Sequence, residues 1–207
     1  MASGCFRSGA LSARTLILSS RSVLDQSLRR IKPEKYLGGL SLRKRSALPF
    51  LSALRPPFPK LLLDTTVYID TVQGVQPEEI DLALRSGNLW HSTVTEAELA
   101  SLSGLLDPKR AETQHVVAQV SSLIEMRPAH RILNPDREIW REAGILAGLL
   151  ARLQGYGKND QRRALNDALL FLSATKHGCA VLTRNLSDFD LLLQLNPRGS
   201  ALFYDRR

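Results

Sequence analysis

The chain has 207 residues, a formal net charge of +8, and 43% hydrophobic and 23% charged residues. This length and composition suit one folded domain, with or without an extension. No apolar run approaches the ~20 residues that a membrane helix needs, so we expect no membrane span. The two cysteines, Cys5 and Cys179, form no Cys-x-x-Cys motif, and the four histidines lack His-x-x-x-His spacing. Both absences argue against a zinc site.

The net positive charge of the chain comes from its first 60 residues. Residues 1–60 carry 12 Lys and Arg but only two acids, whereas residues 61–207 carry 16 basic and 18 acidic side chains. The second part would therefore not be classed as nucleic-acid-binding from its charge. The Pro-Pro-x-Pro run at 56–59 ends any preceding helix, so we place a domain boundary at residue 60.

Residues 1–60 are expected to be a largely disordered basic extension, rich in Ser and Pro. Their few apolar positions are not regularly spaced, so little buried surface would offset the entropy of ordering them. A short helix near Ser22–Arg30 is the exception. The first 24 residues, with no acid, resemble a transit peptide in composition. An unstructured arm and translated sequence upstream of the true start are the alternatives.

After this boundary, segments with strand-like and helix-like patterns alternate. In chain order we expect a buried strand Leu61–Leu63 followed by a turn and a short helix, a helix Pro77–Arg85, a strand Leu89–Val94, a helix from about Thr95 to Leu106, a helix Pro108–Met126, an extended segment His130–Leu133, a helix Pro135–Leu153, a loop at 154–161, a helix Ala164–His177, a strand Cys179–Thr183, a helix Asp188–Leu195 and a last strand Ala201–Tyr204. This alternation predicts an α/β domain at 61–207 with a mostly parallel sheet.

Four acids follow the predicted strands at comparable places. Asp64 follows the first strand, and Glu98 lies in the first turn of the helix after the second. Asp167 is predicted to open the apolar helix, and Asp188 comes soon after the strand Cys179–Thr183. The carboxyl ends of parallel strands share one edge of the sheet, where ligands bind. We therefore expect these acids to gather there.

Each acid also has a purely structural explanation. Thr95 to Glu98 fits a capping box, and Asn185 to Asp188 could cap its helix in the same way. Asp64 and Asp167 could stabilise helix N-termini. Taken together, four carboxylates at one edge would repel one another unless cations neutralised them. Oxygen ligands without Cys or His favour Mg²⁺ or Mn²⁺, and such a site suits phosphodiester hydrolysis.

Four segments of the chain, in order, resemble the motifs of PIN domains. They are 61–70 with Asp64, 92–100 with the pair Glu98-Leu99, 166–178 with Asp167, and 181–189 with Asp188. The likeness runs from about Leu61 to Tyr204 and is nearest to VapC-type toxins, the ribonuclease halves of bacterial toxin–antitoxin pairs. It implies a PIN-like α/β/α sandwich.

The resemblance also implies roles for particular residues. Asp64, Glu98 and Asp167 correspond to the core metal ligands and catalytic acids. Many PIN domains have Asp where this chain has Asn185, and an acid follows three residues later at Asp188, so the fourth ligand is left open between these two. Candidate substrate contacts are Thr65, Thr183 and Arg184, although turn or surface roles would explain them too. Asp70 is expected to be a helix-end or surface acid, and Trp140 a core or interface residue.

The sequence therefore predicts a Mg²⁺-dependent endoribonuclease, with Mn²⁺ as an alternative ion, that cuts single-stranded or looped RNA. The resemblance implies a homodimer in the bacterial cytoplasm and a small antitoxin that covers the site. A non-catalytic PIN-like RNA-binding or regulatory module is the alternative, because the fourth position has lost a charge. The transit-like start suggests a second alternative, an organellar or DNA-directed nuclease.

Overall fold

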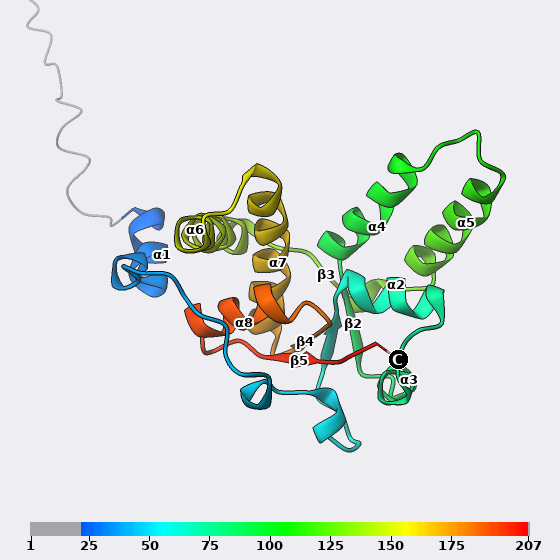
Figure 1. Cartoon of the computed structure of the whole chain (residues 1–207), viewed down its shortest axis with the longest axis horizontal. Helices are drawn as coiled ribbons and strands as arrows, with labels where there is room; N and C mark the ends of the chain where they lie inside the picture. Colours follow the sequence, from blue (N-terminus) through cyan, green and yellow to red (C-terminus); the bar gives the residue numbers. More distant parts are fainter. Residues whose placement is uncertain (1–21, 207) are drawn as a thin grey trace, which may run out of the picture.

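The computed structural model describes residues 22–206, which form a five-stranded parallel sheet. Its strand order is β3-β2-β1-β4-β5, from β1 (Leu61–Leu63), β2 (Leu89–Ser92), β3 (Ile132–Leu133), β4 (Ala180–Thr183) and β5 (Ala201–Phe203). Figure 1 shows helices on both faces of this sheet. The predicted PIN-like α/β/α sandwich with a parallel central sheet is confirmed. Within the described range, no helix combines the length and apolarity that crossing a bilayer requires.

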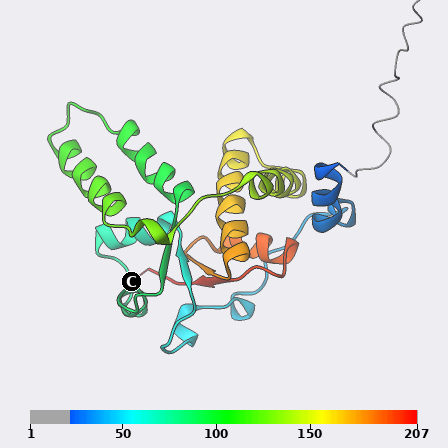
Figure 2. The same cartoon turned by 180° about the vertical axis from the view of Figure 1, so that it is seen from behind.

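Strand β1 separates two apolar layers because its side chains alternate between faces. Leu62 packs with α6 (Arg137–Gln154), α7 (Lys158–His177) and α8 (Leu186–Leu195). Leu61 and Leu63 pack on the other face with α2 (Thr65–Gln73) and α3 (Glu78–Arg85). The same layer contains one face of the hairpin formed by α4 (Thr93–Leu105) and α5 (Ala111–Glu125), which projects away from the sheet in Figures 1 and 2.

The sheet topology fixes where chemistry can occur. From β1 the chain proceeds to β2 on one side, whereas β4 lies on the other side, so the strand order reverses at β1. Ligands of parallel sheets bind at such reversals, beyond the carboxyl ends of the strands. Leu63 pairs with Leu182, which places the next residues, Asp64 and Thr183, side by side at this edge.

Helix α4 begins earlier than its sequence pattern predicts. Ser92 is the N-cap, and its hydroxyl accepts a hydrogen bond from the backbone nitrogen of Val94 at 3.1 Å. Thr95 is buried inside the helix and donates to the carbonyl oxygen of Leu63 at 3.3 Å. The capping-box explanation of Glu98 is therefore wrong, and the Glu98 side chain is not used to cap its own helix.

Helix α7 also begins earlier, at Lys158 instead of Ala164. Its first turns are polar and largely exposed, so they lack the apolar periodicity on which the prediction depended. Asp167 consequently lies in the third turn and does not open the helix. The explanation of Asp167 as an acid that stabilises a helix N-terminus is excluded, because that effect falls off within the first turn.

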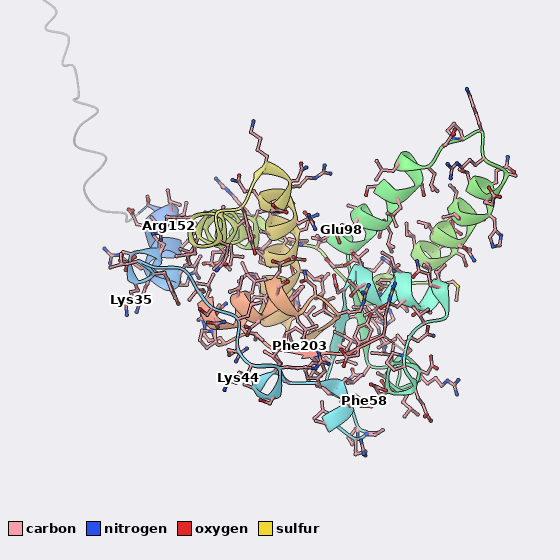
Figure 3. All side chains as sticks on the ribbon, in the orientation of Figure 1. Lys35, Lys44, Phe58, Glu98, Arg152 and Phe203 are labelled. Atoms are coloured by element: carbon pink, nitrogen blue, oxygen red, sulfur yellow. The ribbon has the colours of Figure 1, made fainter. Side chains whose placement is uncertain are left out.

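The expectation of disorder in the extension is wrong for residues 22–60; residues 1–21 lie outside the described range. The predicted short helix is present as α1 (Val23–Ile31), with a capping box between Ser22 and Asp25. Three short 3₁₀ helices follow: η2 (Pro33–Lys35), η3 (Arg45–Ala47) and η4 (Leu51–Ala53). Basic side chains such as Lys35 and Lys44 lie on the outside of this segment (Figure 3).

Long-range contacts hold residues 22–60 against the sheet and helices. Arg43 binds Asp190, a carboxylate 1% exposed, through both its backbone nitrogen and its guanidinium. Leu51 and Phe58 are buried in the core layer beneath β1. Phe50 forms a parallel bridge with Phe203 of β5. These contacts are distant in sequence, so local composition does not reveal them. The domain boundary at residue 60 stays a prediction.

Candidate active site

Asp64 lies at the carboxyl end of β1 and is 4% exposed. Its Oδ2 accepts hydrogen bonds from the hydroxyls of Thr66 and Thr183, each at 2.7 Å. Burial raises the pKa of Asp64, and these hydroxyl donors partly counteract that rise. The side chain is thus held in one orientation by donors from α2 and from the end of β4.

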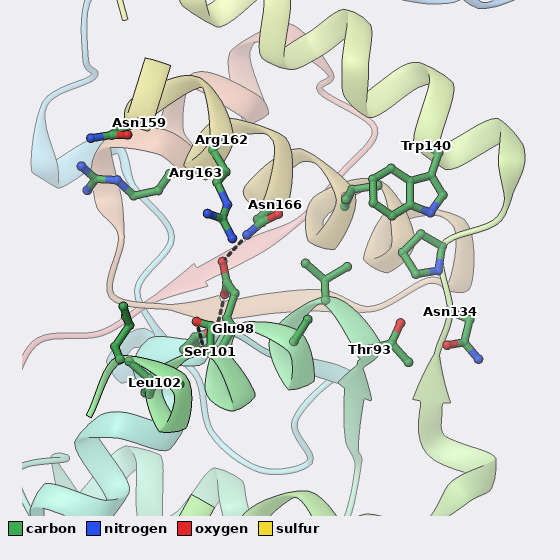
Figure 4. A pocket seen from close by; sticks show the side chains of 17 residues that line it. Thr93, Glu98, Ser101, Leu102, Asn134, Trp140, Asn159, Arg162, Arg163 and Asn166 are labelled. Atoms are coloured by element: carbon green, nitrogen blue, oxygen red, sulfur yellow. Dashed lines mark hydrogen bonds between the residues drawn. The ribbon is translucent and has the colours of Figure 1, made fainter. Parts of the chain in front are cut away.

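Glu98, on α4, faces α7 across the same edge. Its Oε1 accepts from the side-chain nitrogen of Asn166 at 2.8 Å (Figure 4), and its Oε2 accepts from the Thr65 hydroxyl. Burial raises the pKa of Glu98, and the nearby charge of Asp64 adds to this effect, while Arg162 opposes it. Two helices and the β1–α2 junction therefore fix this carboxylate.

Asp167 and Asp188 are linked by Asn185. The Asn185 side-chain nitrogen donates to Oδ2 of Asp167 at 3.2 Å and to Oδ2 of Asp188 at 2.9 Å. The Asn185 oxygen accepts from the backbone nitrogen of Asp188 at 3.3 Å, which makes Asn185 the N-cap of α8. The Tyr156 hydroxyl donates to the other oxygen of Asp188 at 2.8 Å.

The four predicted acids form one electrostatic group. The pKa of Asp167 is raised well above its usual value, first by burial and then by the charges of Asp64, Asp188 and Glu98. Hydrogen bonds show the same proximity, because Asn185 donates to both Asp167 and Asp188, and Thr183 bonds to both Asp64 and the backbone nitrogen of Asn185. The gathering of all four acids at the carboxyl edge of the sheet, expected from the strand order, is thus found.

The donor chemistry of this group fits a hard divalent cation, because it supplies carboxylate oxygens and one amide without Cys or His. A cation would also relieve the repulsion around Asp167. Among residues 22–206, however, no three His, Cys, Asp or Glu side chains are arranged to hold a metal ion as they stand. Each of the four carboxylates instead accepts a hydrogen bond from a neighbouring hydroxyl or amide group.

The three predicted substrate contacts take part in the internal bonding of the site. Thr65 holds Glu98 and Thr183 holds Asp64, as described above. The Arg184 guanidinium forms an ion pair with Asp70 at 2.9 Å. Asp70 is fully buried and is also bound by Tyr204 and Arg206, so the expectation of a surface acid is wrong. The alternative of a helix-end acid fits its position, because Asp70 lies in the last turn of α2.

A groove of about 840 Å³ is lined by Glu98 but by none of the other three acids, and sequence reasoning missed its polar wall. Figure 4 shows Arg162 next to Asn166, with Arg163 and Asn159 further along α7. Trp140 of α6 lines the same groove and lies apart from these groups in Figure 4. It is 51% exposed, which excludes the core position and leaves the expected interface position open. The first turns of α7 carry these groups, and their polarity made them resemble a loop in the sequence.

Solved structures of bacterial proteins align with about 70% of this chain. FitAcB from Neisseria gonorrhoeae is 22% identical and aligns with a TM-score of 0.48 over 70% of this chain and 96% of its own. VapBC2 from Rickettsia felis, bound to a fragment of its promoter DNA, is 16% identical with a TM-score of 0.49 over 70% and 98%. VapBC-1 from nontypeable Haemophilus influenzae is 19% identical with a TM-score of 0.49 over 69% and 96%.

No curated protein matches the chain by sequence. The profile of the PIN domain, by contrast, matches residues 61–190. This match covers more than half of the chain and spans the segments that carry Asp64, Glu98, Asp167 and Asp188. The chain therefore belongs to the PIN domain family.

Proposed function

We propose that the chain is a divalent-metal-dependent nuclease that hydrolyses phosphodiester bonds in single-stranded RNA. The observation that supports this proposal is the hydrogen-bond network that joins the carboxylates: Asn185 donates to both Asp167 and Asp188, and Thr183 bonds to both Asp64 and the backbone nitrogen of Asn185. Burial and then the charges of the other three acids raise the pKa of Asp167, so a folded protein keeps such a group only at a cost in stability. A bound cation would relieve this repulsion, and the free energy released would contribute to the affinity for the ion. This favours a functional role for the four acids over a purely structural one.

In this proposal Asp64, Glu98, Asp167 and Asp188 hold Mg²⁺, or Mn²⁺ in its place. A divalent ion supplies positive charge to the scissile phosphate and lowers the pKa of water that it binds. Glu98 and Asp188 must leave some of their present hydrogen bonds to converge on one ion. Asn185 contributes its amide N–H groups, because its carbonyl oxygen already caps α8.

Neighbouring side chains of the protein orient the carboxylates of Asp64 and Glu98. Thr183 and Thr66 fix the rotamer of Asp64, and Asn166 restrains Glu98 until the ion binds. Arg184 is committed to Asp70 and acts as a structural link between α2 and the end of β4. We therefore no longer assign Arg184 to substrate phosphate, and Arg162 takes that role because it lies beside Glu98 in the groove.

The groove favours a single strand over a duplex. Arginines on α7 offer phosphate contacts, and the exposed Trp140 of α6 offers a stacking surface in the same groove. Bases can stack on an aromatic ring only when they are unpaired, and proteins that bind single strands combine these two features. RNA, not DNA, is the substrate that the motif likeness to VapC-type toxins favours.

A non-catalytic RNA-binding module is the second candidate. The observation in its favour is that the described acids are not arranged to hold an ion as they stand. A toxin role in the bacterial cytoplasm, with a small antitoxin and a homodimer, rests on the motif likeness alone. An antitoxin would be a protein, encoded beside this chain, that co-purifies with it and blocks its groove.

Substrate competition separates these candidates. Labelled single-stranded RNA, duplex RNA and single-stranded DNA of one sequence are incubated together with the purified chain and Mg²⁺. The proposal predicts that single-stranded RNA is cut first and that Asp64→Asn cuts none of them. Binding of RNA without cleavage by the wild type would favour the binding module, and preferential cleavage of DNA would identify a DNA-directed nuclease.

A further inference from the structure

Arg127, just beyond the end of α5, is 7% exposed and has no acceptor. None of its three guanidinium nitrogens has a hydrogen-bond partner within residues 22–206. Its charged group instead lies 4.4 Å from the ring centroid of Tyr68 on α2. A buried guanidinium without an acceptor loses its hydration and gains only the ring contact in return.

Arg127 is among the residues that line an open-sided cavity of about 360 Å³, whose other lining residues include members of α2, β2 and α5. Figure 1 shows how these elements are arranged. Much of the cavity wall is aliphatic, including Leu63, Val67 and Leu84. The four acids of the candidate active site do not line it. The size is that of a small-molecule site, and an apolar wall with a few polar groups is the usual composition of such sites.

The charge of the cavity wall is positive and unbalanced. Arg131 also lines the cavity and donates a hydrogen bond to the carbonyl oxygen of Gly87. Burial, together with the charges of Arg127 and Arg131, lowers the pKa of His91 to about 4. His91 is therefore neutral near pH 7, and no Asp or Glu is among the residues that line the cavity.

We propose that this cavity binds a small organic monoanion with an aliphatic body, of the medium-chain carboxylate class. The carboxylate accepts hydrogen bonds from the unpartnered nitrogens of Arg127, and the chain packs against the leucine and valine side chains. A guanidinium and a carboxylate form a charge-assisted pair of matched geometry. The four acids of the candidate active site do not line this cavity, so the proposal does not depend on the nuclease assignment.

Titration calorimetry with three probes tests each part of the proposal. Octanoate has both the charge and the chain, octanol has the chain alone, and acetate has the charge alone. Octanoate should bind saturably at one site per chain, and each of the other two should bind at least about tenfold more weakly, because each lacks one half of the interaction.

Two variants assign the charge to one residue. Arg127→Met should weaken octanoate binding by about tenfold or more. Arg110→Met removes the same charge from an exposed position before α5 and should leave binding unchanged. If Arg127→Met does not fold, Arg127→Gln replaces it, since the amide keeps the polarity and loses the charge. Equal octanoate binding by wild type and the Arg127 variant, equal binding of octanol, or no saturable binding would each overturn the proposal.

Discussion

The side-chain amide of Asn185 donates a hydrogen bond to Oδ2 of Asp167 at 3.2 Å. Many PIN domains carry Asp at the position that corresponds to Asn185. In this chain the Asn185 amide therefore donates a hydrogen bond to Asp167, whereas an Asp at position 185 would add a further negative charge beside it. In the proposed site Asp188 supplies negative charge, and Asn185 supplies hydrogen-bond donors that an ionised Asp could not supply.

This division predicts unequal effects of two substitutions. Asp188→Ala should reduce Mg²⁺-dependent cleavage more than Asn185→Ala does, because only Asp188 adds negative charge for the ion. Asn185→Ala should instead lower the stability of the fold by about 1 kcal/mol, since it removes the N-cap of α8. Metal titrations of both variants, with thermal unfolding alongside, measure the two effects. A weaker Mg²⁺ dependence in Asn185→Ala than in Asp188→Ala would reverse the assignment.

The groove predicts a further pair of effects on RNA affinity. Trp140→Ala should lose about 1–3 kcal/mol of binding to single-stranded RNA through lost stacking. Arg162→Gln should weaken binding and reduce the steepness of its salt dependence by about one phosphate contact. Both are measured in an Asp64→Asn background, so that RNA stays intact.

Arg55→Gln is the matched control for the groove. Arg55 is exposed, lies outside the groove, and contacts only backbone carbonyls of its own turn. Its loss should leave RNA affinity close to that of the parent protein. Equal losses for Arg55→Gln and Arg162→Gln would mean that the chain binds RNA through general positive charge and not through this groove.

His91 predicts how stability changes with pH. Burial and two arginines lower its folded pKa to about 4, whereas the unfolded value is near 6.5. Between these values the unfolded chain binds more protons, so this residue destabilises the fold as the pH falls from 6.5 to 4, by up to about 3 kcal/mol. The neutral state is supported by Tyr68, whose hydroxyl hydrogen-bonds to Nδ1 of His91.

Urea unfolding of wild type and His91→Gln across this pH range isolates the effect. The carboxylates near Asp64 have raised pKa values and titrate with the opposite sign, but they do so in both proteins. The stability difference between the two proteins should therefore shift in favour of His91→Gln as the pH falls. A difference that stays constant from pH 6.5 to pH 4 would contradict the buried neutral His91.

Residues 22–60 are predicted to be needed for stability. A chain that begins at Lys60 lacks Leu51 and Phe58 in the core and leaves buried Asp190 without Arg43. Its free energy of unfolding should fall by several kcal/mol. A chain that begins at Ser22 is the control and should match the full chain. Equal unfolding midpoints for the two truncated chains would contradict this prediction and show that residues 22–60 add nothing to the stability of the fold.

Local pattern was sufficient where an element has one clear period or one clear cap. The apolar run Leu61–Leu63 and the glycine after His177 marked β1 and the end of α7 correctly. Prediction from the sequence pattern failed where tertiary contacts determine the local structure. Thr95 looked like a cap but bonds to Leu63 of the neighbouring strand, and the polar first turns of α7 face solvent.

The acids of the site were identifiable because parallel strands bring distant residues to one edge. Their partners were not, because Asn166, Arg162 and Trp140 meet the site only through the packing of α6 and α7. The burial of Asp70 was not predicted for the same reason, because its partners Arg184 and Arg206 are more than 100 residues away in the sequence.

The central claim is that the carboxylates around Asp167 perform metal-dependent cleavage. Single-turnover cleavage of one labelled single-stranded RNA, by wild type and by Asp167→Asn, with Mg²⁺ or with EDTA, tests it most directly. We predict cleavage only by the wild type with Mg²⁺, while Asp167→Asn stays folded and at least as stable, because the substitution relieves the repulsion. Full activity in EDTA, or equal cleavage by Asp167→Asn, would contradict the claim.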